Sequence, residues 1–449
     1  MKVLKLLVWM VAALVSLALL AIAIWHVTDE TPAPAQEAAA RNSFDSELLV
    51  LVDGDMTATA YADAQLHPVD DPRDLLLRFD GEITEVAEAS NTVMGWPGAT
   101  AVVGGRALVI ESRGPAPRDR DAFETSVYEE MPFGTRLHSV DLRTGERDVV
   151  EVCRQPMSVD VAPGGNWALV ACGDDAGELA VVVLSGGVPT DVRRLDPDLS
   201  IFPRRPWDEG AGYAVVHPGG AAAAVLSANT GVTLVRFTLD ADGIPEAVEA
   251  EDTIALDGYV SMARWSPTGR HLLVADVGWG MAPTDALTNG PGAILSIALD
   301  PDGEARGVVS RAVVGKSPEA FELDRDGTLL AVVNMERSYL PGGPLALVPG
   351  RSASSLSLVA FDPATGELET LGAPVGFRGV LPEDAAFDAD GDSLAVVVYQ
   401  DHDAPLSDGW LAFFDIDRTG ARPVARLTDR RVALPRGGHD LVALDATPR

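Results

Sequence analysis

The chain ends on "GGHDLVALD" (residues 437–445), with only "ATPR" after it, and this stretch decides the fold. It has the pattern of one β-strand preceded by a turn, and a single strand must pair with others to be stable. The start of the body supplies three strands that lack a fourth: "LLVLVD" (48–53), "LLLRFD" (75–80) and "EITEVAEA" (82–89). We therefore expect the two ends of the chain to share one sheet, with strand 440–445 beside strand 48–53.

Between these ends one unit recurs, and a recurring unit of this length is typical of repeat folds. Each unit has a first strand, a Pro/Asp/Gly turn, a very apolar second strand, a variable loop, and two further strands joined by a second tight turn. The first turns are "VVGG" (102–105), "APGG" (162–165), "HPGG" (217–220), "SPTG" (266–269), "DRDG" (324–327) and "DADG" (388–391). The apolar runs after them, such as "WALVAC" (167–172), are typical of strands buried on both faces.

Six complete units and the shared one predict an all-β fold, a seven-bladed β-propeller of four-stranded antiparallel blades. Pairing of the C-terminal strand with the N-terminal strands closes the ring and removes free sheet edges. An open sandwich or two separate β domains is the alternative. It is less favoured because the repeat keeps its phase from end to end.

The N-terminal segment is long and apolar. Residues 6–25, "LLVWMVAALVSLALLAIAIW", carry no charge, follow Lys2 and Lys5, and are long enough to span a bilayer. We expect a membrane anchor or signal segment at 1–27, a Pro/Ala-rich linker at 28–46 and the propeller at 47–449. A transmembrane anchor is the first interpretation, and a signal peptide cleaved after "APA" (33–35) is the alternative. In both cases the body is exported, periplasmic or extracellular, and meets the membrane only through this segment.

Composition narrows the partners and the compartment. The chain has 34 Lys and Arg against 67 Asp and Glu, a formal net charge of −33, which repels phosphate backbones, so we expect no nucleic-acid partner. Cations or basic partners suit such a surface. The two cysteines, Cys153 and Cys172, permit one disulfide in an exported protein, and two buried thiols are the alternative.

From about residue 90 the chain resembles the lactonase-type and YVTN-type seven-bladed propellers. The stretches "YAVVHPGGAAAAVLSANTGVTLVRFTLDADG" (213–243) and "ARWSPTGRHLLVADVGW" (263–279) carry the resemblance. It implies the propeller fold. In phosphogluconolactonase-like members, Pro-Arg or Pro-Arg-His elements open some inner strands and line a pocket for an anionic substrate. The equivalent openings here are "SPEAF" (317–321) and "LPEDAAF" (381–387), so Glu319 and Glu383 stand where the family has Arg, and the Arg/His pocket pattern is not kept.

Aligned strand openings indicate where a site would lie. They place six residues in equivalent positions at the channel mouth: Met157, Gly212, Ser261, Glu319, Glu383 and Asp440. Three neighbouring blades thus present acids there. The ligand-binding candidates are Glu319, Glu383, Asp384, His439 and Asp440, with Asp401, His402 and Asp403 from a nearby loop. Clustered carboxylates repel one another unless a cation or a raised pKa relieves them.

Glu319, Glu383 and Asp440 are the candidate metal ligands, and their oxygen atoms suit calcium or magnesium, whereas His439 would admit zinc or manganese. A solvated acidic surface is the alternative to a metal site. The long loops 112–135, 277–292, 335–354 and 400–409 project from the same face, where binding usually resides.

No catalytic motif identifies a catalytic residue. The sequence therefore favours an extracytoplasmic binding or interaction scaffold that takes a protein, small-molecule or sugar ligand at the long-loop face and acidic channel mouth. The alternative is a lactonase-like hydrolase or lyase, with these acids as general acid and base and a metal as electrophile.

Overall fold

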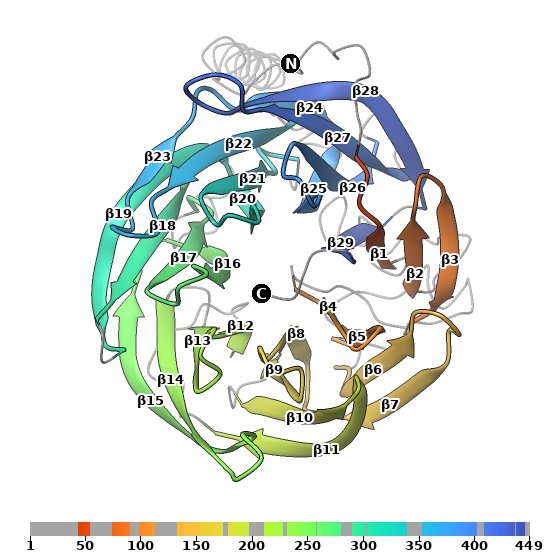
Figure 1. Ribbon diagram of the computed structural model, residues 1–449, viewed down its shortest axis with the longest axis vertical. Helices are drawn as coiled ribbons and strands as arrows, with labels where there is room; N and C mark the ends of the chain where they lie inside the picture. The colour runs from red at the N-terminus through yellow and green to blue at the C-terminus, as the bar shows by residue number, and fades with distance from the viewer. Residues whose placement is uncertain are drawn as a thin grey trace, which may run out of the picture.

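A computed structural model describes residues 44–53, 74–89, 98–112, 133–173, 178–196, 211–227, 231–256, 258–279, 290–300, 303–338, 353–401, 408–435 and 437–444. These residues form seven antiparallel sheets arranged in a ring as the blades of a propeller (Figure 1). In this fold the blades surround a central channel. The sheets are named here blades 1 to 7 in chain order, and the first strand of each lies innermost.

Blade 1 contains β29 (Gly438–Ala443), β1 (Leu48–Asp53), β2 (Asp74–Phe79) and β3 (Ile83–Glu88). Blade 2 contains β4 (Thr100–Val103), β5 (Arg106–Ile110), β6 (Arg136–Asp141) and β7 (Arg147–Glu151). Blade 3 contains β8 (Pro156–Val161), β9 (Trp167–Cys172), β10 (Leu179–Ser185) and β11 (Val188–Leu195). Blade 4 contains β12 (Ala211–Val216), β13 (Ala222–Ser227), β14 (Gly231–Leu239) and β15 (Pro245–Ala255).

Blade 5 contains β16 (Val260–Trp265), β17 (His271–Asp276), β18 (Pro291–Leu299) and β19 (Ala305–Lys316). Blade 6 contains β20 (Pro318–Leu323), β21 (Leu329–Asn334) and β22 (Ala353–Phe361), and its outer strand is broken into β23 (Leu368–Thr370) and β24 (Val375–Arg378). Blade 7 contains β25 (Val380–Phe387), β26 (Ser393–Gln400), β27 (Gly409–Asp417) and β28 (Val424–Leu434).

The ring closes as predicted, because the C-terminal strand β29 pairs antiparallel with the N-terminal strand β1. Leu48 lies opposite Ala443, and Leu51 lies opposite Asp440. The closing strand spans 438–443 and not the expected 440–445. It begins earlier because Gly438 still pairs with Val52, and His439, between Gly438 and Asp440, bulges out of the ladder. The seven-bladed architecture predicted from the repeat is confirmed.

The turn glycines that defined the repeat have the backbone that their type allows. The φ angles of these glycines all lie between 66° and 76°, a region that residues with a Cβ rarely adopt. The glycines are Gly105, Gly165, Gly220, Gly269, Gly327 and Gly391. Each closes the hairpin between the first and second strands of its blade. The repeat is therefore set by a conformational requirement at one position.

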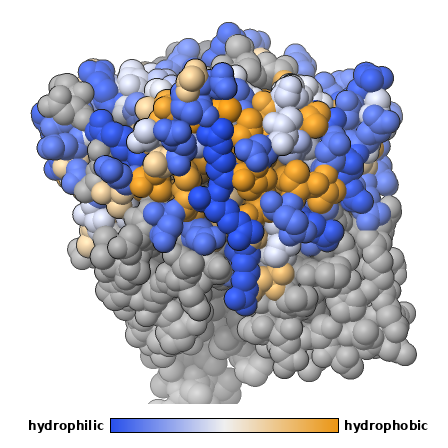
Figure 2. Space-filling view, turned by 90° about the horizontal axis from the view of Figure 1, so that it is seen from below, coloured by the Kyte–Doolittle hydropathy of each residue, from blue (hydrophilic) through white to orange (hydrophobic). Residues whose placement is uncertain are grey.

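The core lies between neighbouring blades, where apolar strands face one another. At the junction of blades 7 and 1, Phe44, Phe79 and Phe413 pack with ring centroids 5.5–6.4 Å apart. On the outer wall, hydrophobic side chains are interrupted by hydrophilic ones (Figure 2). Packing between blades thus supplies the apolar burial that a single twisted sheet cannot reach.

The structure joins Cys153 and Cys172 by a disulfide. Cys153 follows β7 and Cys172 ends β9, so the bond ties the crossover out of blade 2 to the second strand of blade 3. Among the described residues there is no helix long and apolar enough to cross a membrane. The predicted anchor at 1–27 and residues 28–43 of the linker lie outside the described residues.

Candidate functional site at the channel mouth

The inner strands of three blades open in the same way. A residue with left-handed backbone comes first, a proline follows, and the next residue leaves the strand ladder. The left-handed residues are Gln155, Ser317 and Leu381, with φ of 55°, 52° and 52°. In blade 1 two glycines replace this pair, and Gly437 has φ 98°. Left-handed backbone at residues with a Cβ is uncommon and concentrates at functional sites.

The residue after this opening is a β-bulge, and the bulged residues define one position around the channel. The ladder between the first and second strands skips Met157, Gly212, Glu319, Glu383 and His439. A bulge re-aims a side chain out of the regular alternation. Here it brings together side chains from the neighbouring strands β20, β25 and β29, which succeed one another around the channel (Figure 1).

The sequence alignment of strand openings was wrong by one residue in blade 1. It placed Asp440 with Glu319 and Glu383, whereas the register gives that position to His439. The error arose because "GGHD" has no proline to mark the opening. The bulged set of neighbouring blades is therefore Glu319, Glu383 and His439, two acids and an imidazole. His439 Nδ1 lies 3.6 Å from Glu383 Oε2.

Asp384 and Asp440 occupy the next position along their strands, and there they hold the ring together. Asp384 Oδ2 accepts a hydrogen bond from the amide of Leu441 at 3.1 Å, and Asp440 Oδ2 accepts one from the amide of Thr100 at 2.6 Å. In blade 3, Ser158 at the same position accepts from the amide of Ala214. The position is thus a contact between blades, and β29 is held from both sides.

The three bulged side chains are buried although two of them are acids. Glu319 is 6% exposed, Glu383 4% and His439 1%. Burial raises the pKa of Glu319 well above its usual value, the charge of Glu383 raises it further, and His439 opposes both. Burial likewise raises the pKa of Asp384, together with the charge of Asp440 and a hydrogen bond to it, against the opposing charge of Arg264.

A second polar layer lies three residues further along the inner strands, and the sequence analysis did not identify it. Arg264 Nη2 lies 2.7 Å from Glu322 Oε2, and Arg264 Nε donates to the carbonyl of Phe321 at 3.0 Å. Burial raises the pKa of Asp160 to about 6, against hydrogen bonding from the Val216 amide and the charge of Arg264. The only signal in the sequence is weak: Asp160, Arg264 and Glu322 stand at matching offsets along their strands.

Aromatic side chains lie at several of the inner-strand openings. Tyr213 of β12 lies near the residue that opens blade 2, since a Cβ on Gly98 would lie 2.7 Å from its ring. The Trp279 indole donates to Ser317 Oγ at 2.8 Å, two residues before Glu319, and its ring centroid lies 5.3 Å from that of Tyr259. The strand openings at the channel mouth therefore carry aromatic rings as well as carboxyl groups.

The remaining candidates are not brought into this cluster. Asp401 forms an ion pair with Arg378 at 3.3 Å, and about two-fifths of each side chain is exposed. His402 and Asp403 lie outside the described residues, as do most residues of the four long loops. Within the described ranges, no three or more His, Cys, Asp or Glu side chains are grouped so that they could hold a metal ion. The predicted metal site at Glu319, Glu383 and Asp440 stays a prediction.

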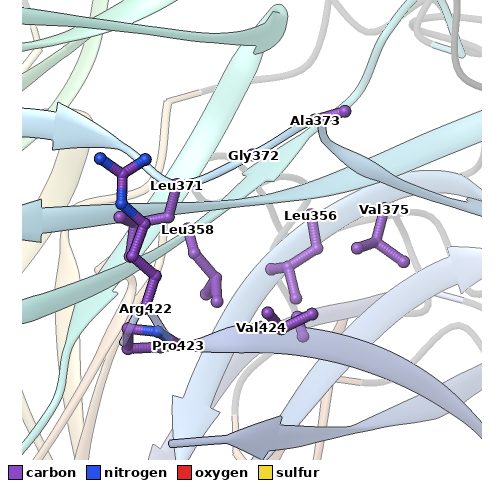
Figure 3. Close-up of a pocket in the computed structure, with 10 residues that line it drawn as sticks. Leu356, Leu358, Leu371, Gly372, Ala373, Val375, Arg422, Pro423 and Val424 are labelled. Carbon is purple, nitrogen blue, oxygen red and sulfur yellow. The ribbon is translucent and has the colours of Figure 1, made fainter. Parts of the chain in front are cut away.

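An apolar groove of about 270 Å³ lies far from these acids, on the outer wall between blades 6 and 7. It opens where the outer strand of blade 6 is broken at residues 371–374. Leu356, Leu358 and Val424 gather around it, and Arg422 and Pro423 lie at one side (Figure 3). Its lining has no carboxyl, imidazole or thiol group. This groove offers no acid–base chemistry, so the channel mouth remains the candidate site.

The comparisons with known proteins agree with this architecture. Two Bacteroides proteins provisionally named 6-phosphogluconolactonases are similar in structure. That of Bacteroides fragilis superposes with a TM-score of 0.58 at 12% identity, over 90% of this chain and 100% of its own. That of Bacteroides uniformis gives 0.55 at 13%, over 89% and 99%.

A protein from Lactobacillus plantarum gives a TM-score of 0.52 at 14% identity, over 88% of this chain and 98% of its own. No family model matches the chain, and no curated protein matches its sequence. At these identities the likeness shows the fold alone. The chain has the fold of a lactonase-like propeller.

Proposed function

We propose that the protein is an exported binding propeller whose ligand engages the channel mouth on the long-loop face. One observation carries this proposal: Glu319, Glu383 and His439 meet at the bulges of three neighbouring blades, each less than a tenth exposed. Acids that merely kept the surface soluble would be solvated. Burying two carboxyl groups side by side costs stability, and sites that accept such a cost are commonly functional.

The disulfide supports export. A disulfide between Cys153 and Cys172 is typical of oxidising compartments, the periplasm or the cell exterior. The charge-free segment at 6–25 after Lys2 and Lys5 supports the same location, as either anchor or signal. The net charge of −33 favours cationic over anionic partners at this surface.

A second candidate function is a hydrolase or lyase, and the ionisation of Glu319 favours it. A carboxyl group whose pKa is raised by burial can serve as general acid, while the adjacent Glu383 beside His439 serves as base. A calcium or magnesium ion held by Glu319 and Glu383 would supply the electrophile in this scheme. The provisional name of the two Bacteroides neighbours fits the same reaction class.

A ligand screen on the purified full chain separates the two functions. Thermal unfolding is followed with lactones, uronic-acid sugars, amines and divalent metals at fixed ionic strength, and product formation is assayed in parallel. A probe that raises the melting temperature without turnover, and no longer does so in Glu383→Gln, supports binding. Turnover that is lost in Glu319→Gln supports the enzyme.

Asp242→Asn is the matched control, because Asp242 lies exposed in a turn at the end of the blade away from the channel mouth. It should behave as the wild type in every arm of the screen. A probe whose effect is equally weakened by Asp242→Asn and Glu383→Gln acts through the general acidity of the protein and contradicts the proposed site.

A further inference from the structure

We infer that the channel mouth binds a protonated amine, with Glu319 and Glu383 receiving the ammonium group. The inference rests on the proposed function and specifies its ligand class. The ammonium group is the chemistry that the site recognises. Its source is either a free small amine or the lysine side chain of a protein partner, and the experiment below distinguishes them.

The first observation is that Glu319 lacks a hydrogen-bond partner among the described residues although it is only 6% exposed. The same chain handles another buried glutamate differently. Glu111 is 2% exposed, and its carboxylate is hydrogen-bonded to Arg136 at 2.9 Å and to His138 at 2.8 Å. A buried carboxyl group without such partners is costly. Glu319 thus lacks a hydrogen-bonded cationic donor of the kind that Arg136 provides to Glu111.

The second observation concerns which cation fits. Asp384 and Asp440 already accept hydrogen bonds from the backbone amides of Leu441 and Thr100, so their oxygens are committed to the ring. Glu319 and Glu383 remain, and no metal-holding group of three exists in the parts of the chain that the structure describes. Calcium needs six to eight oxygen ligands. An ammonium group has only three donors to place, which two carboxyl groups and one further acceptor satisfy.

The third observation is a pair of aromatic rings at the strand opening that carries Glu319. Trp279 and Tyr259 stand together next to Ser317, and Ser317 opens the strand that carries Glu319. Organic cations are attracted to aromatic faces, and their alkyl bodies are buried favourably against them. A hydrated metal ion gains nothing from such a surface. Aromatic rings at the strand opening that carries Glu319 therefore favour an ammonium group that carries a carbon chain.

Proton exchange accompanies binding. At a pH below the raised pKa of Glu319, its carboxyl group carries a proton, which goes to solvent when an ammonium group arrives and an ion pair forms: COOH + RNH₃⁺ gives COO⁻···⁺H₃NR + H⁺. The charge of the ligand stabilises the carboxylate that burial disfavours. Binding of an amine at a pH below this raised pKa should release protons, whereas binding of a neutral ligand should release none.

Titration calorimetry on the full chain tests the inference. The probes are n-butylammonium chloride, N-acetyl-lysine amide, n-butanol and magnesium chloride, at fixed ionic strength and near pH 7, in two buffers that contain no primary amine and differ in ionisation enthalpy. We expect an amine to bind with heats that differ between the buffers, and n-butanol not to bind. Glu319→Gln should weaken amine binding at least tenfold and abolish the buffer dependence, whereas Asp242→Asn should change neither.

Comparison of the two amine probes identifies the source of the ammonium group. Tighter binding of N-acetyl-lysine amide identifies a lysine side chain of a protein, and tighter binding of n-butylammonium identifies a free amine. If magnesium, a lactone or a uronic-acid sugar binds and neither amine does, the inference is overturned and the proposed function stands. If every probe in both experiments leaves the protein unchanged, both fail.

Discussion

At the scale of single residues, Glu111 and Glu319 are two buried glutamates in opposite surroundings. Burial alone would raise the pKa of Glu111, but hydrogen bonds and charge from His138 and Arg136 outweigh it, so the pKa lies below its usual value. Burial and the charge of Glu383 raise the pKa of Glu319. The first carboxyl group stabilises the fold and the second costs it stability. Sequence could not distinguish them, because their partners are distant in the chain or in other blades.

The contacts of Glu111 with Arg136 and His138 give the first prediction, a loss of stability when the charge of Glu111 is removed. Glu111→Gln removes the anion from His138 and Arg136 and should lower the free energy of unfolding near pH 7 by about 3 kcal/mol. Because the folded pKa of Glu111 is lowered, its contribution is present above the unfolded pKa and is lost as pH falls through the folded one. Denaturant unfolding at pH 7 and pH 3 measures both values. An equal loss at the two pH values would contradict this account of Glu111.

At the scale of elements, the opening of an inner strand decides which side chain faces its neighbours. The proline-containing openings "SPE" (317–319) and "LPE" (381–383) could be identified in the sequence. The alignment therefore placed Glu319 and Glu383 correctly in equivalent positions. The exact position of the bulge in β29, which opens with glycines, could not be determined from the sequence. A one-residue bulge changes neither the composition of a strand nor its alternation of apolar and polar residues in a recognisable way. That single residue separates a closure contact, Asp440, from a channel-mouth residue, His439.

The closure contacts of β29 give the second prediction. Asp440→Ala leaves the Thr100 amide without its 2.6 Å acceptor and should destabilise the protein by about 1–3 kcal/mol. Asp440→Asn retains an oxygen acceptor and should cost less. Thermal unfolding monitored by circular dichroism gives the order wild type, Asn, Ala. If the alanine variant melts with the wild type, Asp440 is not a closure contact.

At the scale of the whole molecule, a repeat with one missing strand predicted a closed ring, and that part of the fold was available from sequence. Turn glycines and apolar runs are local signals, and closure follows from counting them. The polar layer of Asp160, Arg264 and Glu322 was not predicted, because its contacts join different blades. Long-range contacts of single side chains are determined by packing and leave only weak patterns along one strand.

Ring closure gives the third prediction. Deletion of residues 437–449 removes β29 and exposes the paired edge of β1. We expect a loss of several kcal/mol of stability or a failure to fold, together with self-association through the freed edge. Thermal unfolding and size-exclusion chromatography measure these effects. A truncated protein that stays monomeric with an unchanged melting temperature would contradict closure by β29.

The central claim is that the channel mouth keeps a buried acid without a partner, ready for a ligand, at a cost to stability. The most direct measurement compares the melting temperatures of the wild type and Glu319→Gln at pH 4 and pH 7.5 without ligand. The folded pKa of Glu319 is raised, so its cost is absent at low pH and grows as pH rises above the unfolded pKa. The account predicts equal melting at pH 4 and a variant more stable by about 1–3 kcal/mol at pH 7.5. A variant that melts at or below the wild type at pH 7.5 would contradict it.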